Sequence, residues 1–139
     1  MNTSNFKTII FAFLTIFLVI SCSEIKTTDP KETYKYWAGT NPSADIEIFN
    51  GQYWRSAHWT LEYIMYLKFK PTEIWWNEFL KQNNIVEDKY EWIFPTDAPD
   101  WFSPSDSFVR YRVERSFDQG SRYFKDRETG ICYIYEIQL

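Results

Sequence analysis

Residues 59–70 read WTLEYIMYLKFK, and their character changes from one position to the next. The odd-numbered positions are all apolar, whereas most of the even-numbered ones are polar. Because successive side chains of a β-strand point to opposite faces, this alternation predicts a strand with one face in a core. Ile64 and Tyr66 interrupt the polar face, which suggests that a loop covers part of it. A helix is the competing interpretation, since Leu, Met and Glu also favour helices.

Just upstream, the sequence predicts a hairpin. Residues 45–49 (DIEIF) alternate between polar and apolar, and residues 52–54 (QYW) follow after Asn50-Gly51. An Asn-Gly pair between two such runs favours a type I′ turn, in which both central residues need positive φ. We therefore expect a turn at Asn50-Gly51, with the second arm continuing or resuming in the strand at 59–70.

An amphipathic helix is expected directly downstream, after Pro71. Thr72 suits the N-cap position, and Glu73 complements the positive end of the helix dipole. At about 100° per residue, one arc of this helix is apolar and Ile74 falls outside it. Asn83-Asn84 is the expected stop, because Asn tolerates the left-handed conformation common after a helix. The apolar arc consists of Trp75, Trp76, Phe79 and Leu80.

The rest of the chain predicts a loop and three more strands. Residues 94–107 (FPTDAPDWFSPSDS) contain three prolines and indicate a long ordered loop. Gly130 supplies the positive φ for a hairpin between the last two strands. The expected strands are 108–115, 121–125 and 131–139. The predicted fold class is α+β, an antiparallel sheet of about five strands with one amphipathic helix packed on a face.

The N-terminus has the three parts of an export signal. Lys7 precedes an apolar run at residues 9–20, and small Ser21 precedes Cys22. The run is shorter than the ~20 apolar residues that span a bilayer. The segment Val19-Ile20-Ser21-Cys22 resembles the lipobox of bacterial lipoprotein signal peptides. The resemblance implies a thioether-linked diacylglycerol on Cys22, cleavage before it and acylation of the new amine. The alternative is a secretory peptide that is cleaved at another small residue, with Cys22 as an ordinary thiol.

These features divide the chain into three parts. Residues 1–21 are the expected signal peptide, residues 22–33 a lipidated tether, and residues 34–139 a single α+β domain. The tether is predicted because residues 23–33 (SEIKTTDPKET) are polar and lack an apolar period. The expected location is the bacterial cell envelope, where the protein is lipid-anchored and either faces the periplasm or is exposed at the surface.

The composition of the mature chain limits its partners. Removing 21 residues leaves 118, with 14 basic and 19 acidic side chains and a net charge near −5. This sign argues against a nucleic-acid partner and predicts that lipid, rather than charge, holds the protein to a membrane. Twenty-five of the 118 residues are aromatic, since four of the 29 Phe, Tyr and Trp precede Cys22. Such a content predicts a large core and some exposed rings.

No pattern points to catalysis, a metal or a cofactor. His58 is the only histidine, and if Cys22 carries lipid then Cys132 has no disulfide partner. Neither residue lies in a recognisable nucleophile motif, and Cys132 is expected to be a small buried hydrophobe. Aspartates in the proline-rich loop (Asp97, Asp100, Asp106) more often cap turns than bind calcium. A hydrolase that uses His58 is the weakest of the functional alternatives.

Two groups of aromatic residues are the candidate binding sites. One is Trp101-Phe102, between prolines and acids; the other is Tyr53-Trp54-Arg55 with His58 and Trp59. Trp, Tyr and Arg dominate protein interfaces, so the leading hypothesis is a non-catalytic module that binds a protein partner. Rings beside acids also suit sugars, so a glycan- or cell-wall-binding lipoprotein is the alternative. A third interpretation is that Trp101 and Phe102 are core residues that hold the loop down.

Overall fold

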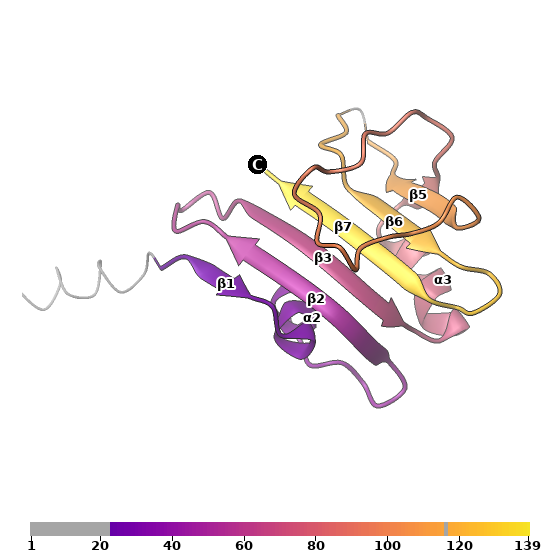
Figure 1. Cartoon of the computed structure of the whole chain (residues 1–139), viewed down its shortest axis with the longest axis horizontal. Coiled ribbons are helices and arrows are strands. Elements are labelled where there is room, and N and C mark those ends of the chain that lie inside the picture. Colours follow the sequence, from indigo (N-terminus) through magenta and orange to yellow (C-terminus); the bar gives the residue numbers. More distant parts are fainter. Residues whose placement is uncertain (1–22, 116) are drawn as a thin grey trace, which may run out of the picture.

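The computed structural model describes residues 23–115 and 117–139. Within them, seven strands form one antiparallel sheet, with two helices behind it and a long loop in front (Figure 1). The strands are β1 (Ile25–Thr27), β2 (Glu47–Arg55), β3 (Tyr63–Lys70), β4 (Ile85–Glu87), β5 (Val109–Val113), β6 (Arg122–Lys125) and β7 (Cys132–Gln138); the helices are α2 (Pro30–Ala38) and α3 (Glu73–Gln82). Their order is β1-β2-β3-β7-β6-β5-β4. The α+β class and the antiparallel sheet are confirmed, but the expected five strands and one helix become seven and two.

β3 is the strand predicted from residues 59–70, although it starts only at Tyr63. Its odd positions Met65, Leu67 and Phe69 are fully buried on the side of the helices. Tyr66 is equally buried on the opposite side, where the loop between β4 and β5 covers it. The break in the polar face therefore does mark cover by a loop.

α3 matches the predicted helix. The Thr72 hydroxyl accepts a hydrogen bond from the Trp75 N–H (3.1 Å), and Glu73 lies in the first turn. Trp76 is 1% exposed, whereas Ile74, outside the apolar arc, is 73% exposed. The helix ends where expected, with Asn84 at φ 51°.

The predicted turn at Asn50-Gly51 is wrong, because β2 runs through both residues, which pair with Lys68 and Leu67 of β3. The register shifts between Ile48 and Asn50, as in a β-bulge. Gly51 is buried, and a Cβ at this position would come within 2.6 Å of the Thr33 Cβ. The glycine is therefore required by the close approach of α2, and β2 and β3 are joined by residues 56–62 instead.

The predicted tether at residues 22–33 is also wrong from Ile25 onward. β1 pairs with β2, with Ile25 opposite Arg55. The Asp29 carboxylate accepts the Glu32 N–H at 2.8 Å and caps α2, whose first residue is proline. Capping and the burial of Thr33 outweigh the polar composition, so the domain includes residues that precede position 34. Cys22 lies outside the described residues.

The C-terminal half follows the prediction closely. β6 and β7 form the expected hairpin, with Gly130 at φ 73°. β7 lies in the centre of the sheet between β3 and β6, so its alternate side chains reach both faces. β4 was not predicted; it adds a short edge strand beside β5.

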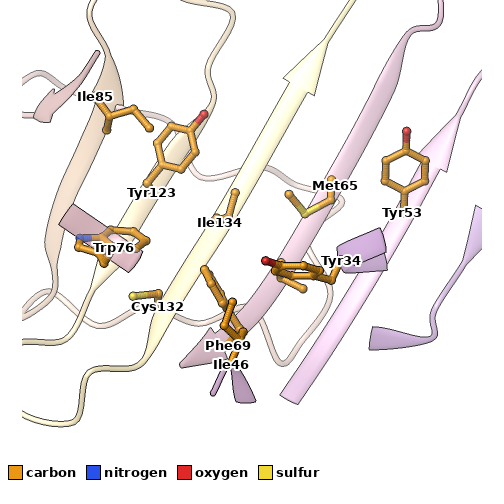
Figure 2. Close-up of a cluster of buried hydrophobic side chains, with 11 residues drawn as sticks. Tyr34, Ile46, Tyr53, Met65, Phe69, Trp76, Ile85, Tyr123, Cys132 and Ile134 are labelled. Carbon is orange, nitrogen blue, oxygen red and sulfur yellow. The ribbon is translucent and has the colours of Figure 1, made fainter. Parts of the chain in front are cut away.

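Each face of the sheet has its own core. Figure 2 shows the helix-side core, which spreads across the strands from Ile85 to Tyr53. The loop-side core is smaller, and Phe102 of the loop reaches its centre. The helix-side core contains Tyr34, Ile46, Tyr53, Met65, Leu67, Phe69, Trp76, Ile85, Tyr123, Cys132 and Ile134. The loop-side core contains Tyr66, Phe102, Phe124, Tyr133 and Tyr135.

A buried carboxylate fixes the start of the covering loop. The side chain of Asp88 is fully buried and accepts hydrogen bonds from Arg122 (2.7 Å) and Arg110 (2.9 Å). Arg122 also pairs with Asp118 at 2.7 Å. Because buried charges are tolerated only when paired, this network joins the loop to β5 and β6.

Candidate functional site

The helix face of the sheet is not completely covered. A pocket of about 670 Å³ opens between the end of α2, α3, and the adjoining parts of β3, β6 and β7. Among its lining residues are three aromatic side chains from the two helices and a carboxylate from β7. These four are Trp37, Trp75, Phe79 and Glu136.

Three donors converge on the carboxylate of Glu136. Trp37 Nε1–H, at the end of α2, donates to Oε2 at 2.9 Å, and the Tyr63 hydroxyl donates to the same oxygen at 2.8 Å. The Tyr123 hydroxyl donates to Oε1 at 2.6 Å. An ionised carboxylate offers about four lone-pair sites. Glu136 can therefore accept one further hydrogen bond from a ligand.

The alternation of β7 places Glu136 in this pocket. Its helix-facing positions are Cys132, Ile134 and Glu136, and Glu136 lies opposite Met65 of β3. The first two are fully buried, whereas Glu136 is half-buried and is contacted by Trp37 at the end of α2. The sequence does show an acid at the end of an otherwise apolar strand face. It does not show the hydrogen-bond donors around this acid, because they come from three separate elements.

The phenols next to Glu136 hold their protons tightly. Burial raises the pKa of Tyr63 and of Tyr123 well above the ordinary value, and the nearby charge of Glu136 raises both further. Both hydroxyl groups therefore remain donors at neutral pH, and the carboxylate keeps a fixed orientation.

Flat rings and amide side chains line much of the rest of the pocket, together with the charged side chains of Arg115 and Asp118. Trp75 and Phe79 stack with centroids 5.2 Å apart, and Trp37 meets Phe79 edge-on at 5.5 Å. Side chains with amide groups lie around them: Asn83, Gln119 and Gln138. The pocket thus combines ring faces with several hydrogen-bonding groups and one acceptor of fixed position.

The second acid of the pocket is held in an ion pair. Asp118 is the other acid among the described lining residues, and both of its oxygens bond to Arg122, at 3.0 and 2.7 Å. The hydrogen bonds from Arg122 lower the pKa of Asp118. A carboxylate held in this way is a poor proton donor at neutral pH.

The residues predicted as one binding site, Trp54, Arg55 and His58, lie at the end of β2 and in the following loop. Trp54 donates a hydrogen bond through Nε1 to Glu24, and both Trp54 and Arg55 are half-buried. His58 is exposed. The structure therefore brings these residues to one end of the sheet, where Arg55 lies opposite Tyr63, a residue that lines the Glu136 pocket.

The second predicted site, Trp101-Phe102, is largely part of the core. Phe102 is 2% exposed and meets Tyr66 and Tyr133 edge-on, with centroids 5.0 and 5.5 Å away. Trp101 is half-buried and packs against the same core. Phe102 is thus wrong as a binding residue, because its side chain is inaccessible to a ligand.

Cys132 and His58 do not meet. Cys132 pairs with Phe69 near the end of β3, whereas His58 precedes the start of that strand. Cys132 is fully buried, and burial raises the pKa of its thiol. It is the buried small hydrophobe that the sequence predicted. Across residues 23–115 and 117–139, no three His, Cys, Asp or Glu side chains converge as metal ligands.

No family model, no curated protein and no solved structure matches the chain. In the described part of the chain, neither helix is long and apolar enough to cross a membrane.

Proposed function

We propose that this chain is a lipid-anchored protein of the bacterial cell envelope that binds a polyhydroxylated ligand, such as a glycan, in the Glu136 pocket. The observation that supports binding is the carboxylate of Glu136, which three hydrogen bonds hold in one orientation among aromatic rings. A side chain with a purely structural role at this position of the sheet would be apolar. The lipid anchor rests on the lipobox at Val19-Ile20-Ser21-Cys22.

The lining chemistry favours sugars over other small ligands. Sugar hydroxyls are donors that a carboxylate accepts strongly, and the apolar faces of sugar rings pack on flat aromatic rings such as Trp75. The neutral amides Asn83, Gln119 and Gln138 can both donate to and accept from hydroxyls.

Binding without turnover is favoured by the carboxylate arrangement. Glycoside hydrolysis usually requires two carboxyl groups with separate acid and base or nucleophile roles. Here Glu136 already accepts three hydrogen bonds, and Asp118 is paired with Arg122. This supports a role in recognition rather than catalysis.

A glycan array probed with the acylated full-length protein tests the ligand class. We expect a saccharide to bind, and Glu136→Gln to weaken its binding about 10–100-fold, since a hydrogen bond to a charged group contributes roughly 1.5–3 kcal/mol. Trp101→Ala is the matched control and should leave binding unchanged. If Trp101→Ala abolished binding of the saccharide and Glu136→Gln did not, the binding site would be the loop at Trp101 and not the Glu136 pocket.

The anchor is tested separately by mass spectrometry. The mature protein should begin at Cys22 and carry the mass of its acyl chains, and Cys22→Ala should move it from the membrane to the soluble fraction. An unmodified Cys22 would refute the anchor without affecting the pocket.

A protein partner is the second candidate function. The segment after β4 exposes large apolar side chains beside the loop-side core, namely Tyr90 (65%), Ile93 (89%) and Phe94 (45%). Exposed apolar side chains that are close together in the sequence favour contact with a protein partner. Crosslinking in intact cells from a photoreactive residue at position 93 should capture an envelope protein if this candidate is right.

A further inference from the structure

The loop between β2 and β3 exposes two large apolar side chains. Trp59 is 89% exposed and Leu61 is 51% exposed. The loop is nevertheless held by backbone hydrogen bonds, from Ser56 N–H to Glu62 O (2.8 Å) and from Leu61 N–H to His58 O (3.1 Å). The two side chains are therefore presented to solvent by an ordered turn.

The start of the domain lies beside this loop. Because β1 and β2 are antiparallel with Ile25 opposite Arg55, the N-terminal end of β1 lies at the end of β2 from which the loop departs (Figure 1). The hydrogen bond between Trp54 and Glu24 holds the preceding residues to the same end. Only Ser23 and Glu24 lie between Cys22 and Ile25, so the Cα atoms of Cys22 and Ile25 are at most about 11 Å apart.

We propose that the loop carrying Trp59 and Leu61 inserts into the interfacial region of the bilayer that holds the acyl chains. The proposal rests on the lipid anchor of the proposed function, which brings this end of the domain to a lipid surface. The domain then lies against the membrane in a fixed orientation. The structure favours this over free movement, since residues 25–38 form β1 and α2 rather than a flexible tether.

The composition of the loop fits a lipid surface better than a charged partner. Residues 56–62 (SAHWTLE) contain no Lys or Arg that could bind anionic headgroups, and Glu62 is their only acid. Trp prefers the membrane–water interface, where its ring is partly in the apolar layer and its N–H is hydrated. Trp59 and Leu61 together provide the apolar area, and acylation provides the local concentration.

Spin labelling tests the proposal, because the structure leaves few reactive thiols. Cys132 is fully buried and Cys22 is acylated in the mature protein, so a cysteine at Thr60, between the two apolar residues, can be labelled selectively. Ile74→Cys is the control; Ile74 is 73% exposed and follows the opposite end of β3. Both full-length, acylated variants are reconstituted into phosphatidylcholine vesicles and floated.

For Thr60→Cys we expect loss of access to a water-soluble paramagnetic reagent and greater access to oxygen than for the Ile74→Cys label. Adding Trp59→Ala and Leu61→Ala to Thr60→Cys should return its label to water. Equal exposure of both labels to water, in protein that floats with the vesicles, would overturn the docking and leave the anchor intact. Protein that fails to float would overturn both.

Discussion

The two faces of the sheet are covered in different ways, and the difference explains where the pocket lies. Two regular helices cover one face, and because a helix is a straight rod, the strand ends beyond α2 and α3 remain open at Glu136. An irregular segment covers the other face and follows its contour, with Phe102 in the centre and Asp88 at its start. The loop therefore acts as a structural layer, and the helix layer leaves room for a ligand.

The largest effect should come from removing the central aromatic side chain of either layer. Trp76→Ala on the helix face and Phe102→Ala on the loop face should each lower the free energy of unfolding by about 3–5 kcal/mol, because both rings are fully buried. Urea unfolding followed by circular dichroism measures this. A negligible change for Phe102→Ala alone would mean that the loop is not a structural layer.

The next largest effect should show whether the loop face of the sheet opens independently of the helix face. Asp88→Asn removes the buried carboxylate shared by Arg122 and Arg110 and should cost about 3 kcal/mol. This is near the lower end for a broken buried pair, because Arg122 keeps its pairing with Asp118 and Arg110 is partly exposed. We expect limited proteolysis to cut within residues 89–107 of the variant before it cuts α2 or α3. Simultaneous cleavage of helices and loop would show that the faces do not open independently.

A smaller effect should follow from crowding the helix layer. Gly51→Ala places a Cβ within 2.6 Å of the Thr33 Cβ, so α2 must move away from β2. The expected cost is about 1–3 kcal/mol, as for other overpacked sites, measured as a lower urea midpoint. Gly51→Ala should cost less in a Thr33→Gly background than in the wild type, because glycine at position 33 removes both the Cβ and the Oγ1 that the new methyl group would meet. If the single variant were as stable as the wild type, the contact between α2 and β2 would be looser than the structure shows.

The smallest effect is a pH dependence that arises in the pocket. The pKa values of Tyr63 and Tyr123 are raised in the folded state, whereas unfolded tyrosines titrate near pH 10. Their contribution to stability is thus complete below about pH 10 and falls as the pH rises, because the unfolded state then releases protons that the folded state retains.

Glu136→Gln isolates this effect. Removing the charge should lower both tyrosine pKa values part of the way, because burial is the larger cause. Stability should then fall less steeply above pH 10 than in the wild type, as measured by urea unfolding at several alkaline pH values. An unchanged slope would mean that the charge of Glu136 has little influence on these phenols.

The parts of the fold that the sequence predicted are those with local signals. The alternation in β3, the cap and apolar arc of α3, and the Gly130 hairpin each lie within a dozen neighbouring residues. Their chemistry was sufficient to locate them.

The errors arose where a distant contact decides the structure. Asn50-Gly51 has the chemistry of a turn, but Gly51 is required by the approach of Thr33. The start of α2 is a different case, because Asp29-Pro30 is a local helix-start signal that the polar composition around it concealed. Glu136 could not be selected as a site from sequence, because its donors Trp37, Tyr63 and Tyr123 come from three separate elements.

The central position of β7 has a consequence for how the protein is made. Residues 132–138 connect two groups of three strands, β1-β2-β3 and β6-β5-β4, which otherwise share no strand pairing. Neither core can close while the ribosome or an export channel still holds this segment, because Cys132 and Ile134 complete one core and Tyr133 and Tyr135 the other. The two cores should therefore form only after residues 132–138 have emerged, and a nonsense mutation upstream of codon 132 should give an aggregation-prone product.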